Sequence, residues 1–118
     1  SPQHVFEKWL SELNRFQDEI KQYQNQLAQV AARDHSDQFH QRTITFRHRF
    51  LDMLERLDQL RHNIFVEQAR YMTQEADAQP VTESEHMDEL VCQSELQDFK
   101  SAYEQLKADV RHFFEEVG

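Results

Sequence analysis

The chain has 118 residues, a formal net charge of −9, two prolines and one glycine. The length fits one domain, and so few helix-breaking residues favour long helices. The acidic balance disfavours binding to nucleic acids and to anionic membrane surfaces, because both targets are themselves negative.

Residues 2–33 carry the most regular apolar pattern of the chain. Ser1 followed by Pro2 fits the first turn of a helix. The apolar side chains then alternate at spacings of three and four residues, which predicts a helix with one core-facing stripe. The stripe consists of Phe6, Trp9, Leu13, Phe16, Ile20, Tyr23, Leu27 and Val30.

Residues 37–76 form the second predicted helix, after turn and cap residues at positions 33–37. Its stripe consists of Phe39, Thr43, Phe46, Phe50, Met53, Leu57, Leu60, Ile64, Glu67 and Tyr71. Glu67 is expected to be a snorkelling or hydrogen-bonded side chain near an edge of the bundle, or else a polar residue that fixes the helix register. Further apolar residues widen the stripe on one flank: Ile44, Leu51, Leu54, Phe65 and Met72.

The widened stripe has two interpretations. The second helix could contact both neighbours and bury all of these residues. Alternatively, Ile44, Leu51, Phe65 and Met72 form an interaction surface for a protein partner or a homodimer, with Phe65 and Met72 the strongest candidates. Arginines of this helix could pair with the acidic third helix. They are Arg42, Arg47, Arg49, Arg56 and Arg61.

Residues 83–117 form the third predicted helix, after a break at Pro80. Thr82 and Glu85 have the spacing of a capping box. The stripe continues through Cys92, Leu96, Phe99, Tyr103, Leu106, Val110, Phe113 and Val117, whereas Met87, Leu90 and Val91 lie off this register and suggest a stutter. Residues 83–118 carry three basic and ten acidic side chains.

Two short connections between three long helices predict an all-α, up-down-up antiparallel three-helix bundle. The heptad spacing predicts left-handed, coiled-coil-like packing over a single domain, residues 1–118. The length, the three heptad helices and the Trp9-Leu10 pair resemble a spectrin repeat, although the third helix lacks the second tryptophan typical of that family. The small, acidic, helical character is also similar to that of secretion and flagellar export chaperones.

Histidines and carboxylates suggest one possible metal site. In an up-down-up bundle, the loop after the first helix and the end of the third helix lie at the same end. His35, Asp37, His40 and His112 could therefore converge there, and such a set could bind zinc or nickel. Cys92 lies on the core stripe, so it is expected to be a buried, unreactive thiol. The short connections do not favour an enzyme, and we expect no cofactor.

The sequence therefore favours a non-catalytic helical interaction module, a scaffold or adaptor that associates with itself or with another protein. Two alternatives are a small acidic chaperone that shields a helical client and a metal-binding bundle. The N-terminal residues lack an apolar signal-peptide stretch, and the sequence has no apolar run long enough to insert in a membrane. With a single cysteine, a cytoplasmic location is expected.

Overall fold

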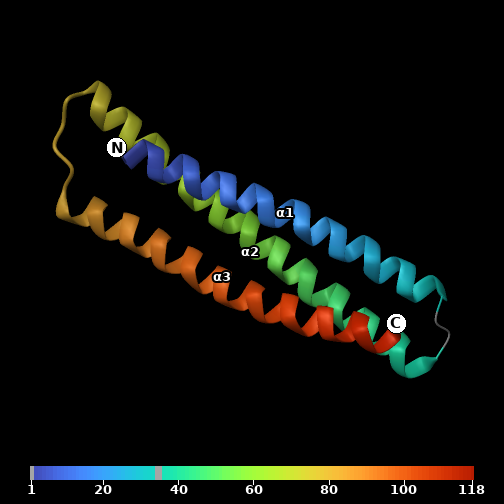
Figure 1. Ribbon diagram of the computed structural model, residues 1–118. Helices are drawn as coiled ribbons and strands as arrows, with labels where there is room; N and C mark the ends of the chain where they lie inside the picture. The colour runs from blue at the N-terminus through green and yellow to red at the C-terminus, as the bar shows by residue number, and fades with distance from the viewer. Residues whose placement is uncertain (1, 34–35) are drawn as a thin grey trace.

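The structure is a computed structural model that describes residues 2–33 and 36–118. Its helices are α1 (Pro2–Arg33), α2 (Asp37–Ala76) and α3 (Glu83–Val117), and these bounds agree with the ranges predicted from the apolar stripes. The helices run up, down and up, which confirms the all-α three-helix bundle (Figure 1). The bundle is a rod that measures 62 × 19 × 17 Å.

The two ends of the rod are built from different parts of the chain (Figure 1). One end holds the start of α1, the end of α2 and the start of α3. The opposite end holds the end of α1, the start of α2 and the end of α3. Among the described residues, no helix has an apolar stretch long enough to cross a membrane.

Side-chain caps fix where α2 and α3 begin. The Ser36 hydroxyl accepts a hydrogen bond from the Phe39 amide at 3.3 Å. Thr82 and Glu85 form the predicted capping box, in which each side chain accepts a hydrogen bond from the other residue's amide. Such caps stabilise helix ends because the first-turn amides have no partner within the helix. After α2, Ala78 adopts a left-handed backbone conformation with φ of 54°.

The three heptad stripes form one core along the rod. Leu13 of α1, Leu57 of α2, and Phe99 and Tyr103 of α3 are completely or almost completely buried. Aromatic rings connect the helices: the Phe16 and Tyr103 ring centroids lie 5.3 Å apart. Each large apolar side chain buried in this way contributes roughly 1.5–3 kcal/mol relative to an exposed one. The core is therefore the main source of stability.

Polar contacts at the edges of the core connect α3 to both other helices. Tyr103 donates a hydrogen bond to Glu19 Oε1 at 2.8 Å, and Lys100 Nζ lies 2.7 Å from Glu12 Oε2. The predicted pairing of α2 arginines with α3 occurs at two positions. Arg49 Nη2 lies 2.9 Å from Asp109 Oδ2, and Arg42 pairs with Glu116.

Another of the five predicted arginines, Arg61, forms its cross-helix hydrogen bonds with α1 instead. Arg61 Nη2 donates to Asn14 Oδ1 at 3.1 Å and to Gln17 Oε1. The Arg56 guanidinium lies 6.0 Å from the ring centroid of Phe99. The predicted pairing with the acidic helix therefore holds for only some of the arginines.

The expected stutter at the start of α3 does not turn its apolar residues inward. The partly buried residues are Glu85, Asp88 and Glu89, and Glu85 and Glu89 continue the spacing of the stripe backward from Cys92. Met87, Leu90 and Val91 are exposed. The first turns of α3 therefore keep the phase of the long stripe that follows them.

Candidate interaction surfaces

The apolar surface predicted on α2 is exposed at three of its four residues. Leu51, Phe65 and Met72 retain 51%, 51% and 53% of their accessible surface. Ile44 is half-buried. Leu54, the remaining flank residue, packs against the core. We call Ile44, Leu51, Phe65 and Met72 the α2 stripe. Exposure of these large side chains excludes the interpretation in which the core buries all of them.

The α2 stripe lies beside the edge of α2 that contacts α1. Gln24 of α1 donates a hydrogen bond to the Arg47 carbonyl at 3.3 Å, and Arg61 contacts α1 as described above. Leu51 and Phe65 follow these two arginines by four residues. Residues four apart are neighbours on a helix surface, so the stripe runs along the outside of the α1–α2 pair. This face is open to a partner helix.

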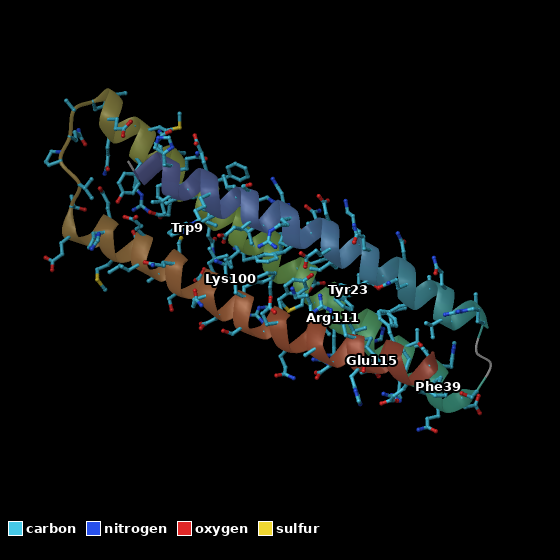
Figure 2. All side chains as sticks on the ribbon, viewed as in Figure 1. Trp9, Tyr23, Phe39, Lys100, Arg111 and Glu115 are labelled. Atoms are coloured by element: carbon cyan, nitrogen blue, oxygen red, sulfur yellow. The ribbon has the colours of Figure 1, made fainter. Side chains whose placement is uncertain are left out.

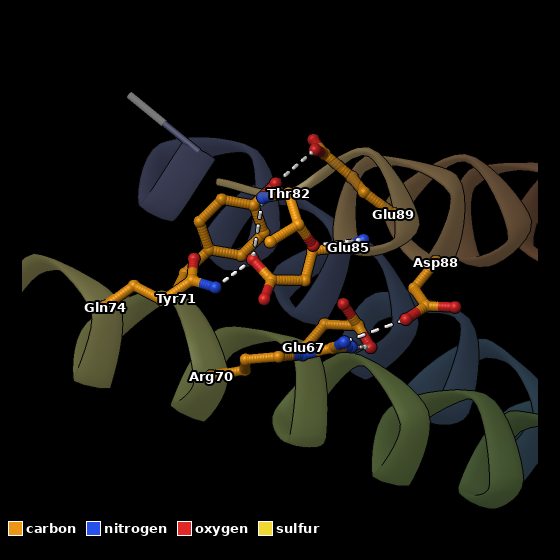
Figure 3. A network of polar contacts seen from close by, with 8 residues as sticks. All are labelled: Glu67, Arg70, Tyr71, Gln74, Thr82, Glu85, Asp88 and Glu89. Atoms are coloured by element: carbon orange, nitrogen blue, oxygen red, sulfur yellow. Dashed lines mark hydrogen bonds and ion pairs between the residues drawn. The ribbon is translucent and has the colours of Figure 1, made fainter. Parts of the chain in front are cut away.

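A polar network occupies the end of the rod where α2 ends and α3 begins (Figure 3). Arg70 of α2 pairs with Glu67 one turn before it, and its Nη1 lies 2.8 Å from Asp88 Oδ2 of α3. Tyr71 donates a hydrogen bond to Glu89 Oε2 at 2.8 Å. Burial and this hydrogen bond raise the pKa of Tyr71 to about 12. The network joins the two helices at positions that hold apolar residues elsewhere along the stripe.

Glu67 belongs to this network and is buried. It retains only 6% of its accessible surface. Among the described residues, its Oε2 atom and the Oε1 atom of Gln74 are buried without a hydrogen-bond partner. The Gln74 amide donates to Glu85. Glu67 is buried, and its ion pair with Arg70 fits the prediction of a hydrogen-bonded side chain. Its role in fixing the helix register stays a prediction.

At the start of α3, apolar side chains face outward and carboxylates face the neighbouring helix. Met87, Leu90 and Val91 retain 55%, 42% and 51% of their accessible surface, while Glu85 and Glu89 face α2 through the network. Met87 and Val91 are one turn apart, so the three apolar side chains share the outward face of the helix. In the sequence these residues lie off the core register, and the structure places them on the outer surface of α3.

A shallow groove between α2 and α3 lies next to this outward face. It has a volume of about 350 Å³. Val66 and Val91 are exposed and line it from the two helices. The remaining lining residues are His62, Asn63, Glu67, Asp88, Cys92 and Glu95. Cys92 is buried, and burial raises the pKa of its thiol.

A larger groove runs between α1 and α3 toward the other end. Its volume is about 620 Å³, and its two aromatic side chains are Tyr23 and Phe114. Tyr23, Arg111 and Glu115 mark its position in Figure 2. The Tyr23 ring is stacked on Phe50, with centroids 5.4 Å apart. The remaining lining residues are polar: Glu19, Gln22, Gln26, Arg111 and Glu115. This lining is more polar than the hydrophobic groove expected of a client-binding chaperone.

The predicted metal cluster is not assembled by the described residues. His112 Nε2 lies 3.2 Å from Glu116 Oε1, and the same carboxylate pairs with Arg42. Within residues 2–33 and 36–118, no group of three or more His, Cys, Asp or Glu side chains is placed to hold a metal ion. His35 lies outside the described residues, so the site formed by His35, Asp37, His40 and His112 stays a prediction.

Trp9, the residue on which the resemblance to spectrin repeats rests, belongs to the core. It is nearly buried, and its ring meets Phe6 edge-to-face with centroids 5.6 Å apart. Phe6 also contacts Tyr71 of the polar network, with centroids 5.3 Å apart. Comparison with protein family models, with characterised proteins and with solved structures finds no match to this chain.

Proposed function

We propose that the chain is a non-catalytic helical interaction module that associates with a second copy of itself through the α2 stripe. The observation that carries this proposal is the half-exposure of Leu51, Phe65 and Met72 on one helix face. Large apolar side chains aligned on one face are enriched at protein interfaces. Covering them with a partner helix would remove them from water.

The spacing of the α2 stripe favours a second copy as the partner. Leu51 and Phe65 lie seven residues on either side of Asp58, and Ile44 and Met72 lie fourteen residues on either side. Two α2 helices packed antiparallel about Asp58 would therefore place Leu51 opposite Phe65, and Ile44 opposite Met72. A two-fold interface needs such a self-complementary surface.

The charge along α2 favours the same antiparallel arrangement. Residues 37–57 carry four arginines and three acidic residues, whereas residues 59–77 carry two arginines and three acidic residues. Antiparallel pairing brings the more basic half of each helix beside the more acidic half of the other. Asp58 would approach its own copy, but Arg61 Nη1 lies 3.2 Å from Asp58 Oδ1 and offsets this repulsion. Such charges select orientation more than they add affinity.

The raised pKa values of two side chains, Cys92 and Tyr103, agree with the non-catalytic part of the proposal. Burial raises the pKa of the Cys92 thiol, so at neutral pH it is less able to act as a nucleophile. The pKa of Tyr103 is also raised, by burial and by the hydrogen bond to Glu19. These shifts stabilise the protonated, less reactive forms.

Light scattering of the purified chain tests the proposal. We expect a dimer that dissociates in the double variant Phe65→Glu, Met72→Glu. The matched control is Gln59→Glu, Thr73→Glu, which places two glutamates on an exposed neighbouring row of the same helix. The control should remain a dimer, and circular dichroism should show that both variants stay helical. A monomeric parent, or a dimer that both variants leave intact, would contradict the proposal.

Disulfide trapping tests the antiparallel arrangement. In a Cys92→Ala background, Leu51→Cys and Phe65→Cys proteins are mixed and oxidised. A disulfide needs Cα atoms within about 7 Å, so only facing positions react efficiently. Antiparallel pairing predicts the mixed Leu51–Phe65 disulfide as the main product. Parallel pairing would instead give two symmetric disulfides, one between the position-51 cysteines and one between the position-65 cysteines.

A further inference from the structure

A second surface, at the start of α3, combines an apolar centre with a negative surround. We define the α3 face as Met87, Leu90 and Val91 together with Val66 of α2. All four side chains are exposed, and Val66 and Val91 line the same groove. Carboxylates that face α2 and apolar side chains that face outward reverse the arrangement of the rest of α3, whose buried residues from Cys92 onward are apolar. Such local exceptions occur where a protein contacts a partner.

The charge around the α3 face has a single sign. Residues 83–98 contain six acidic residues and no lysine or arginine. Arg70 of α2 reaches into this region, but it already pairs with Glu67 and Asp88. The groove beside the face is lined by the carboxylates of Glu67, Asp88 and Glu95. Glu85, Glu89 and Glu95 accept hydrogen bonds from uncharged side chains of α2, and these donors leave the negative charge of the carboxylates in place.

We propose that the α3 face binds a basic amphipathic helix of another protein. The exposed side chains at positions 87, 90 and 91 have the spacing that packs against one apolar helix face. Lysine or arginine residues flanking the apolar face of the partner would lie beside the carboxylates of residues 83–98. The valine-lined groove suits the aliphatic stem of such a side chain, and Glu67, Asp88 and Glu95 suit its charged head.

The same charge argues against other occupants. Two copies joined through this face by a two-fold axis would bring the acidic residues 83–98 of one chain against those of the other. Nucleic acids and anionic membranes are repelled for the same reason. A cationic helix is the occupant that gains from both the apolar side chains and the carboxylates.

Fluorescence anisotropy with a synthetic peptide tests this inference. The probe is a labelled amphipathic peptide of about 18 residues, or five helical turns, with leucine on one face and lysine on the others. We expect micromolar binding that weakens when the ionic strength is raised. A peptide in which glutamate replaces every lysine should not bind. Binding of the glutamate peptide with equal affinity would overturn the charge argument.

Matched variants locate the binding surface. The double variant Met87→Ser, Val91→Ser should weaken binding of the lysine peptide about tenfold or more, because two apolar contacts are lost. The control Leu51→Ser, Phe65→Ser removes equally exposed side chains from the α2 stripe and should change the affinity less than about twofold. The variant Glu95→Gln, Asp98→Asn should weaken binding at low salt and much less at high salt. Circular dichroism verifies that all three stay folded.

The outcomes separate this inference from the proposed self-association. If the peptide does not bind, or binds Met87→Ser, Val91→Ser as tightly as the parent, the inference is wrong whatever the oligomeric state. If the solution mass falls in that variant, a second copy occupies the α3 face, and the inference is also wrong. A monomeric Leu51→Ser, Phe65→Ser protein that still binds the peptide would show two independent surfaces.

Discussion

Replacement of Glu67 with leucine tests whether the buried carboxylate at the end of the core costs stability. The Glu67 side chain is 8% exposed, and its Oε2 atom has no hydrogen-bond partner among the described residues. An unsatisfied buried polar atom costs about 1–3 kcal/mol, and a buried leucine contributes roughly 1.5–3 kcal/mol. The variant also loses the contact between Glu67 and Arg70, and this loss reduces the gain in stability. That arginine is 32% exposed and keeps Asp88 at 2.8 Å, so the loss should be about 1 kcal/mol.

These contributions together predict that Glu67→Leu raises the free energy of unfolding by about 1.5–5 kcal/mol. Chemical denaturation at one fixed protein concentration measures this difference, because self-association would otherwise shift the transition. The control is Glu55→Leu on the exposed surface of α2, where the change should stay within about 0.5 kcal/mol. A loss of stability in Glu67→Leu would refute the reasoning. It would show that the contacts of Glu67 within the network contribute more to stability than burial of its carboxylate costs.

Three further predictions address the backbone, the network and the core. Ala78→Gly should stabilise the chain by about 1 kcal/mol, because glycine adopts a φ of 54° without strain. The control Ala69→Gly within α2 should destabilise the chain by a similar amount, and chemical denaturation measures both differences. Tyrosinate absorbance should show Tyr71 titrating near pH 12. Because this pKa is raised, the stability it contributes is present below about pH 10 and is lost as the pH rises toward 12, a loss that Tyr71→Phe should reduce. Leu13→Ala should lower the free energy of unfolding by about 2–5 kcal/mol, because Leu13 is buried, whereas Leu51→Ala at an exposed position should lower it far less. Equal losses in the two variants would contradict this difference in burial.

The sequence was sufficient to predict the helices and most of the core. The spacing of α1 from Phe6 to Val30 matches its buried positions, except that Tyr23 is only partly buried. The capping box at Thr82 and Glu85 is also as predicted. These features depend on local periodicity and on contacts between residues a few positions apart. Both kinds of information are present in a single sequence.

The start of α3 was not predictable by the same reasoning. Periodicity assumes that apolar residues turn inward, so Met87, Leu90 and Val91 suggested a stutter. A continuous helix instead keeps the phase set by the longer stripe after Cys92, and Tyr71 and Gln74 of α2 supply hydrogen bonds to the inward glutamates. That compensation comes from residues on another helix. Only the three-dimensional arrangement could show it, and the outward α3 face is its result.

The odd number of helices determines how the rod would respond to mechanical force. Because the chain passes along the rod three times, α1 starts at one end and α3 finishes at the other (Figure 1). A pull on Pro2 and Val117 would act along the helix axes and shear the packed stripes past one another. Anchors at the same end would instead separate the helices one turn at a time. Single-molecule stretching should therefore give a higher unfolding force between opposite ends than between two points at the same end.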